Sequence, residues 1–288
     1  NVWTKQEDNI LSNTSLGYDV IAGQLPHRSQ KSIWQRAHKL GFNRNNSIIA
    51  KVNSENQRKK EWDTLLNDKE FCEVIDGELL GDGCIFRKKV KNRSCYEYTF
   101  IAGSIHQEYA EYLHGILAPK LESKAQIKIV QPSSRRFPNA KVFSNTKMFY
   151  SVRFSSVVFK PFYDRWYPIG SIKTTCPQDL VLTPTTCLHW YLGDGSLDSD
   201  FKRRMFEITL NTQNFKHCEV DKMSELLATS LMIKTGTRKS NRTYKTTNRT
   251  YKAIRIHGQY AREFLSYIGS SPVKCFDYKW RDWKKGGS

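Results

Sequence analysis

Two aspartates stand in the same short stretch of sequence. Leu80-Gly81-Asp82-Gly83 closes one apolar run, and Leu192-Gly193-Asp194-Gly195 closes another. Each run predicts a helix that ends at its aspartate, because the glycine behind it lets the chain turn. A shared site for divalent metal ions needs one carboxylate from each side. The repeat therefore predicts two halves of the chain that form one active site together.

Two lysines repeat in a similar way. Gly-Ser-Ile-Lys closes the first half at Lys173, and Phe-Asp-Tyr-Lys closes the second half at Lys279. Both follow the last predicted helix of a half, which supports the duplication. Lys274 competes with Lys279 for the second position, and a lysine that contacts phosphate or is merely solvated is the alternative interpretation.

The apolar periodicity around the aspartates predicts the element order α-β-β-α-β-β-α twice. In the first half these are a helix ending at Asp82, strands at about 84–90 and 95–102, a helix at about 106–121, a basic hairpin at about 125–154 and a helix at 157–166. In the second half these are a helix from Thr183-Pro184 to Asp194, strands near 196 and at 205–211, a helix at about 217–231, a basic hairpin at about 234–257 and a helix at 259–267. The duplication predicts an α+β fold with two equivalent antiparallel sheets about a pseudo-twofold axis, joined through the first helix of each half. Gly77 stands where the second helix has His189, so we expect that contact to be asymmetric.

The charge balance indicates a polyanionic partner. Lys and Arg number 46 against 28 Asp and Glu, a formal net charge of +18. Such an excess destabilises a compact fold unless an anionic partner compensates it, and double-stranded DNA is the first candidate. A membrane surface is the weaker alternative, because no apolar stretch reaches the roughly 18–20 residues of a membrane span.

The cysteines indicate the compartment. There are seven, an odd number, with no Cys-x-x-Cys pair. This usage argues against a disulfide framework and against zinc, and it predicts an intracellular, reducing environment.

The sequence divides into an amino-terminal module, a linker and two halves, predicted at 1–43, 44–66, 67–175 and 176–288. The module predicts three short amphipathic helices. It resembles Myb/SANT-like helix-turn-helix modules at Trp3-Thr4-x-x-Glu7-Asp8, Ile21-Ala22-x-x-Leu25 and 36–42 (Arg-Ala-His-Lys-Leu-Gly-Phe). Its third helix has the layout of a helix for the major groove, with a solvated helix face as the alternative. The candidate DNA-binding residues there are Lys31, Ser32, Gln35, Arg36 and Lys39.

Both predicted hairpins are basic ribbons of the kind that fits a major groove. Candidate DNA contacts in the first half are Arg87 and Lys89 in a basic turn, then Arg135, Arg136, Lys141, Lys147 and Arg153. Candidates in the second half are Arg238, Lys239, Arg242, Lys245, Arg249, Lys252 and Arg255. Solvated basic loops are the alternative interpretation.

Residues Ile75–Gly83 and Cys187–Gly195 resemble the namesake motif of the single-chain, two-motif LAGLIDADG homing endonucleases. They agree strictly at the closing Asp-Gly and loosely before it, with Glu78 among the departures. The resemblance implies a duplicated αββαββα core with two saddle-like sheets and a monomer that cleaves both strands of a long asymmetric duplex, leaving 3′ overhangs. An RNA maturase and a catalytically silent DNA-binding regulator are the alternatives, and a strand-specific nickase stays open.

The same resemblance assigns roles to residues. Asp82 and Asp194 would bind Mg²⁺, two or three ions per active centre, with Mn²⁺ or Ca²⁺ able to replace it in binding. The carbonyls of Gly81 and Gly193 would help to hold the metal. A lysine in the place of Lys173 and of Lys279 would orient the attacking water or stabilise the transition state. Water-positioning side chains would follow the second strand of each half, where Gln213 and Ser104 stand.

Overall fold

The computed structural model describes residues 2–13, 16–42, 62–90, 95–121, 127–130, 149–170, 172–200, 205–244 and 247–281. The chain divides into two compact units, residues 1–64 and 65–288. Across the described ranges, none of the helices combines the length and the apolar character that a membrane span requires. All seven cysteines are free thiols.

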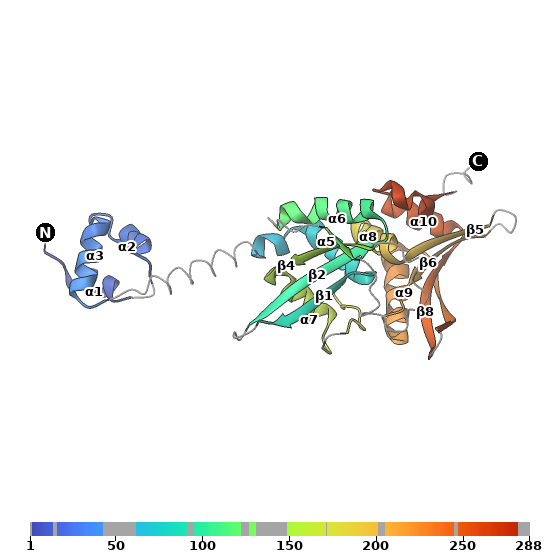
Figure 1. Cartoon of the computed structure of the whole chain (residues 1–288), viewed down its shortest axis with the longest axis horizontal. Coiled ribbons are helices and arrows are strands. Elements are labelled where there is room, and N and C mark those ends of the chain that lie inside the picture. Colours follow the sequence, from blue (N-terminus) through green and yellow to red (C-terminus); the bar gives the residue numbers. More distant parts are fainter. Residues whose placement is uncertain are drawn as a thin grey trace. The chain divides into compact units, whose positions relative to one another are not determined.

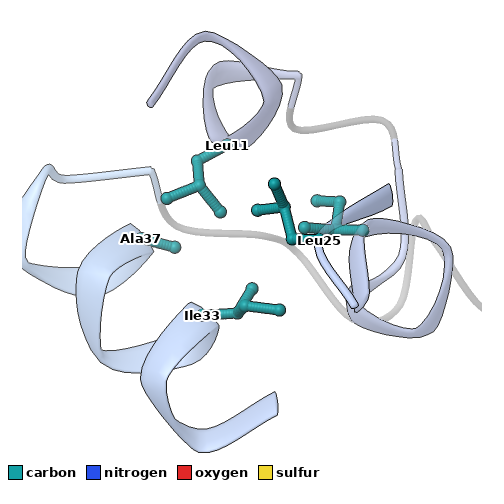
Figure 2. Packing of buried hydrophobic residues seen from close by; sticks show 5 residues of the cluster. Leu11, Leu25, Ile33 and Ala37 are labelled. Carbon is teal, nitrogen blue, oxygen red and sulfur yellow. The ribbon is translucent and has the colours of Figure 1, made fainter. Parts of the chain in front are cut away.

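The amino-terminal unit contains three short helices around a small apolar core. They are α1 (Lys5–Ser12), α2 (Tyr18–Gln24) and α3 (Gln30–Lys39). Thr4 and Glu7 form a capping box at the start of α1, and Ser29 caps α3. These caps satisfy backbone donors that have no partner inside a helix. Figure 2 shows the core, which consists of Leu11, Ile21, Leu25, Ile33 and Ala37.

Trp34 departs from the predicted apolar stripe of α3. Its side chain is 52% exposed, whereas Ile33 and Ala37 are fully buried. Residues four apart share a helix face, so Ile33 and Ala37 fill the inner face and Trp34 lies on the outer side. There it packs on His38, with 5.5 Å between ring centroids.

The first half of the second unit begins with α5 and ends with α7 (Figure 1). Its elements are α5 (Lys69–Leu80), β1 (Cys84–Lys89), β2 (Tyr96–Ser104), α6 (Gln107–Lys120), β3 (Lys128–Val130), β4 (Phe149–Ser155), the 3₁₀-helix η2 (Val157–Phe159) and α7 (Lys160–Trp166). The strands form an antiparallel sheet in the order β1-β2-β4-β3. Helix α5 ends at Leu80, so Asp82 lies in the turn behind it rather than on the helix.

The helix predicted at 157–166 is divided into η2 and α7. Pro161 lacks the N–H that would bond to Val157 if the α-helix ran through. Instead Lys160 donates to the Val157 carbonyl, a 3₁₀-type bond, and Ser156 caps the turn. The α-helical pattern therefore starts only at Lys160.

The second half repeats this order and adds a closing 3₁₀-helix. Its elements are α8 (Pro184–Asp194), β5 (Gly195–Asp200), β6 (Met205–Asn211), α9 (His217–Leu231), β7 (Thr235–Tyr244), β8 (Thr247–His257), α10 (Gln259–Ile268) and η3 (Lys274–Trp280). The sheet order is β5-β6-β8-β7, again antiparallel. Thr183 caps α8 through its hydroxyl, and Pro184 occupies the first turn, where a missing N–H costs nothing.

The predicted α+β duplication is confirmed. Figure 1 shows α5 and α8 side by side at the centre of the unit, with one sheet beyond each. Helix α6 covers one face of the first sheet, and α9 and α10 cover one face of the second. The strands alternate accordingly, with Phe100, Phe154, Ile208 and Ile254 buried against the helices. The other face of each sheet, which we call the open face, carries no helix of its own half among the residues that the structure describes.

Candidate active site

Helices α5 and α8 touch backbone to backbone. A Cβ placed on Gly77 would lie 2.6 Å from both the Thr186 carbonyl oxygen and the His189 Cβ, and one placed on Gly81 would lie 3.6 Å from the Gly193 Cα. Only glycine permits the first of these approaches. The predicted asymmetry is confirmed, because His189 of α8 packs against Gly77 of α5.

A buried polar cluster holds the two helices on this asymmetric side. Glu78 is 4% exposed, accepts a hydrogen bond from the Tyr109 hydroxyl of α6, and lies 2.8 Å from His189 Nδ1. His189 is itself 1% exposed. This cluster could not be predicted from the sequence, where Glu78 is only a departure from the motif, because its members come together from three helices.

The helix ends place Asp82 and Asp194 next to each other. A Cβ on Gly193 would lie 3.5 Å from the Asp82 nitrogen, and one on Gly81 would lie 3.7 Å from the Asp194 nitrogen. Asp82 is exposed and Asp194 is half-buried. The two carboxylates thus adjoin at an accessible surface, each carried by a different half of the unit.

The surroundings of both carboxyls disfavour their ionised form. The pKa of Asp194 rises from 3.8 to about 8, mainly because the carboxyl is buried and also because the charge of Asp82 is close to it. Desolvation by the surrounding protein also raises the pKa of Asp82, whose side chain is only partly open to water, and Glu78 acts in the same direction. Two carboxylates in this relation repel one another unless cations lie between them.

Lys173 and Lys279 approach the site from the ends of the two halves. Lys173 Nζ donates to the carbonyls of Gly81 and Gly83 at 2.7 and 2.8 Å, and Lys279 Nζ donates to those of Leu192 and Tyr191 at 2.7 and 3.0 Å. Both are buried, at 7% and 4% exposed, whereas Lys274 is exposed.

Burial is also the main cause that lowers the pKa of each lysine, from 10.5 to about 8. Asp194 acts against this shift in both cases, since an adjacent carboxylate favours the ammonium form. Each lysine therefore stabilises negative charge at the end of a helix, where unpaired carbonyls also gather.

The oxygen atoms at the helix ends fit a hard divalent cation. Across the described residues, no group of three or more His, Cys, Asp or Glu side chains could hold a metal ion. The site offers two carboxylates instead, and Mg²⁺ is commonly held by one or two carboxylates together with water and substrate phosphate. The Gly81 carbonyl already accepts from Lys173, which leaves it one lone pair. The Gly193 carbonyl is not among the acceptors of Lys279.

Asn211 is a polar residue at the site that the sequence interpretation missed. It lies at the end of β6, and its Nδ2 donates to the Asp194 carbonyl at 2.9 Å. Gln213, the predicted water-positioning residue, is exposed in the turn two residues further on. Ser104 accepts a hydrogen bond from the His106 backbone. The register Gly195↔Leu210 brings Asn211 to the aspartate, and the sequence alone does not show this register.

The identity of the chain follows from comparison with known families. The sequence model of the LAGLIDADG DNA endonuclease family matches residues 72–262, a span that includes both aspartates. The chain belongs to the LAGLIDADG DNA endonuclease family. This family match covers both sheets and both central helices.

Two proteins are similar to this LAGLIDADG chain in sequence over most of its length. The uncharacterized protein MJ1098 of Methanocaldococcus jannaschii is 25% identical over 214 residues, 72% of this chain and 74% of that protein. The cytochrome b mRNA maturase bI2 of Debaryomyces hansenii is 26% identical over 178 residues, 60% of this chain and 61% of the maturase.

Solved structures with similarity to this LAGLIDADG chain include three homing endonucleases or meganucleases bound to DNA. I-WcaI with its recognition sequence has a TM-score of 0.49 at 17% identity, covering 72% of this chain and 84% of that one. I-SmaMI with uncleavable DNA has a TM-score of 0.45 at 11% identity, covering 74% and 88%. I-GzeII with its DNA target has a TM-score of 0.44 at 10% identity, also covering 74% and 88%.

In the second LAGLIDADG half, strand alternation divides the basic side chains between the two faces of the sheet. Arg255 is opposite Thr209 and Arg238 is opposite Ala253, both on the open face. Lys252 lies on the other face, where it pairs with Asp221 of α9. Lys239 is directly opposite Lys252 in the register and shares that face. The sequence predicts all four as DNA contacts, whereas the structure leaves Arg238 and Arg255 on the open face.

The first LAGLIDADG half shows the same division. Arg87 is opposite buried Tyr98, and its guanidinium lies 5.0 Å from the ring centroid of Tyr163 in α7. Lys89, two residues along, shares the helix-covered face. Arg153 lies on the open face, opposite Ile101. Seven further predicted contacts lie outside the residues or side chains that the structure describes: Arg135, Arg136, Lys141, Lys147, Arg242, Lys245 and Arg249.

Helix α3 of the amino-terminal unit presents most of its predicted DNA-binding residues to solvent. Lys31, Gln35 and Lys39 are exposed and Ser32 is half-buried. Arg36 is the exception, because its guanidinium forms two hydrogen bonds with the Asp8 carboxylate, at 2.6 and 2.9 Å. Arg36 thus ties α3 to α1.

Proposed function

We propose that the chain is a site-specific, divalent-metal-dependent DNA endonuclease that cleaves both strands of a long, asymmetric duplex and leaves 3′ overhangs. The observation that carries the proposal is the adjoining of Asp82 and Asp194 at the ends of α5 and α8, each with a buried lysine behind it. Because one chain supplies both carboxylates, a monomer suffices for double-strand cleavage.

Magnesium is the metal we infer, held by Asp82, Asp194 and the carbonyls of Gly81 and Gly193. The donors are all oxygen, which suits Mg²⁺ better than zinc or copper. Such ions, when bound, polarise the scissile phosphate, lower the pKa of an attacking water and stabilise the leaving oxygen.

The protein's own groups supply the setting for this chemistry. Burial raises the pKa of both aspartates, and Lys173 and Lys279 offset part of that rise, which favours the ionised carboxylates that bind a cation. Their buried ammonium groups are also positioned to stabilise charge that develops on the phosphate. Arg153, Arg238 and Arg255 on the open faces, together with α3 of the amino-terminal unit, are the proposed contacts with the duplex.

The test is to incubate the full chain with a randomised duplex DNA library and Mg²⁺ and to sequence the ends produced. We expect one recurrent site with 3′ overhangs. Asp82→Asn and Asp194→Asn should each abolish cleavage and retain binding in Ca²⁺, with Asp198→Asn, an exposed carboxylate on β5, as the matched control. Full cleavage by either active-site variant would overturn the assignment of that carboxylate. Duplex binding should weaken steeply with salt, because many phosphates are neutralised.

An RNA maturase is the second candidate, and the similarity to the Debaryomyces hansenii maturase favours it. The two candidates are distinguished by comparing the affinity of the chain for a duplex DNA library with its affinity for structured intron RNAs of equal length. A maturase would bind the RNA more tightly and would keep that binding in Asp82→Asn and Asp194→Asn. A silent DNA-binding regulator would bind duplex DNA without cutting it in Mg²⁺ or Mn²⁺.

A further inference from the structure

The two sheets carry one arginine each at equivalent positions of their open faces. In the first sheet, Arg153 is opposite Ile101 of β2, and Ile101 is opposite Cys84, the second residue after Asp82. In the second sheet, Arg255 is opposite Thr209 of β6, and Thr209 is opposite Ser196, the second residue after Asp194. The Nε of both arginines is buried and has no hydrogen-bond partner in the described part of the chain. The two guanidinium groups thus occupy matching places beside the active site.

Their surroundings differ in one carboxylate. Arg255 forms an ion pair with Glu207, whose side chain is 3% exposed against 19% for Arg255. The second oxygen of Glu207 lies 2.5 Å from His257 Nδ1. The buried Glu207 carboxylate therefore lies between Arg255 and His257 and offsets the charge of Arg255, although its Oε1 accepts no hydrogen bond in the described part of the chain.

The first sheet has hydroxyl groups where the second has this carboxylate. Glu207 is opposite His257, and the equivalent pair is Thr99 opposite Ser155. The two hydroxyl oxygens lie 2.8 Å apart. No carboxylate of the described residues is within ion-pair distance of Arg153. Glu207 therefore offsets the charge of Arg255, whereas Arg153 keeps its net charge.

These two states suit different contacts with a duplex. An arginine that keeps its net charge can neutralise a phosphate and release counterions. A guanidinium held in a fixed plane by a carboxylate contributes little net charge but presents its donors in a defined direction, as the paired acceptors of a guanine edge require.

We propose that Glu207 is a specificity-determining positioning residue, which holds Arg255 for reading a base edge in the second half-site, while Arg153 makes a charge-based phosphate contact in the first. This inference rests on the proposed DNA-binding function. The second half-site then contributes more of the base recognition, and the first contributes more of the electrostatic affinity. The difference is caused by the Glu207 side chain.

Because the halves are equivalent, each supplies the control for the other. The variants are Glu207→Thr, which gives the second sheet the residue of the first, and the reciprocal Thr99→Glu. The probe is the duplex that the wild-type full chain selects from a randomised library in Ca²⁺. Affinity is measured across a salt series and against every single-base change of that duplex.

We expect Glu207→Thr to steepen the plot of log affinity against log salt by about 0.9, one additional phosphate contact. We expect it also to reduce discrimination roughly 5- to 150-fold at one base of the second half-site. Thr99→Glu should flatten the salt plot by about the same amount, and the double variant should return to the wild-type slope. Unchanged slopes and unchanged base discrimination in both single variants would overturn the inference.

A folding defect is separated from this effect by a third variant. Glu207→Gln keeps the side-chain size and loses only the charge, so it should reproduce the change in slope while its circular-dichroism spectrum at the assay temperature matches that of the wild type. If the wild-type chain itself showed no salt-dependent binding to any duplex, the proposed function would fail and this inference with it. Normal wild-type binding with unaltered variants overturns this inference alone.

Discussion

Replacing Asp194 with asparagine should make the fold of the metal-free protein more stable, and it should abolish cleavage in the presence of Mg²⁺. Burial and the neighbouring charge of Asp82 raise the pKa of the Asp194 carboxyl from 3.8 to about 8. In the unfolded chain this carboxyl titrates near its ordinary value of about 3.9. Between these two values the folded protein keeps a proton that the unfolded chain has released. The free energy of unfolding therefore falls as the pH rises from about 4 to about 8.

The size of the effect follows from the two pKa values. A single group of this kind costs about 1.4 kcal/mol of stability per pH unit, so about 4 kcal/mol is lost by pH 7. Asparagine is uncharged and removes this loss. The same substitution also removes a carboxylate that favours the ammonium forms of Lys173 and Lys279. We therefore expect a net gain of about 2 kcal/mol at pH 7, or a rise in melting temperature of about 4–8 °C.

The assay is urea unfolding followed by circular dichroism, in EDTA, at intervals between pH 4 and pH 8. The wild type should lose stability with rising pH, and Asp194→Asn should give a shallower decline, because the Asp82 carboxyl keeps a raised pKa. Asp198→Asn, which removes an exposed carboxylate of β5, should follow the wild type. Added Mg²⁺ should stabilise the wild type more than Asp194→Asn, because ligand binding favours the folded state. Parallel pH profiles for the wild type and Asp194→Asn would refute the electrostatic argument.

Three further predictions test the packing and charge of both units. Gly77→Ala should cost about 1–3 kcal/mol in urea unfolding, because its Cβ would lie 2.6 Å from the facing helix, whereas Gly115→Ala, with nothing within 4 Å, should be neutral or stabilising. Lys279→Met should slow single-turnover cleavage about 100-fold while binding in Ca²⁺ is retained. Lys274→Met, at an exposed lysine, should leave the cleavage rate unchanged. Equal cleavage rates for the two variants would show that Lys279 does not act in the site. Hydrogen bonds, above all from Arg28, lower the pKa of Glu7, so the stability that Glu7 contributes is present above about pH 4.5 and is lost as the pH falls. In amide NMR spectra of the full chain, Glu7→Gln should weaken the amino-terminal unit at neutral pH and remove this acid sensitivity, and an unaltered acid transition would contradict that role.

The sequence by itself determined the elements and their duplication. Capping residues such as Thr4 and Thr183 and the apolar periods act over a few residues, so the helices fall close to their predicted ranges. The two Gly-Asp-Gly turns could be placed for the same reason. The α+β class and the repeated element order followed from these local signals, and the duplication itself predicted that the first helix of each half would meet.

Only the tertiary structure decided which side chains act together. Strand alternation separates Arg255 from Lys252, but the register and the position of the covering helices determine which of them lies on the open face. Glu207 is buried because residues far along the chain surround it. Lys173 reaches the carbonyls of Gly81 and Gly83 across about ninety residues of sequence. Contacts between distant segments depend on packing geometry, which local propensity and periodicity do not encode.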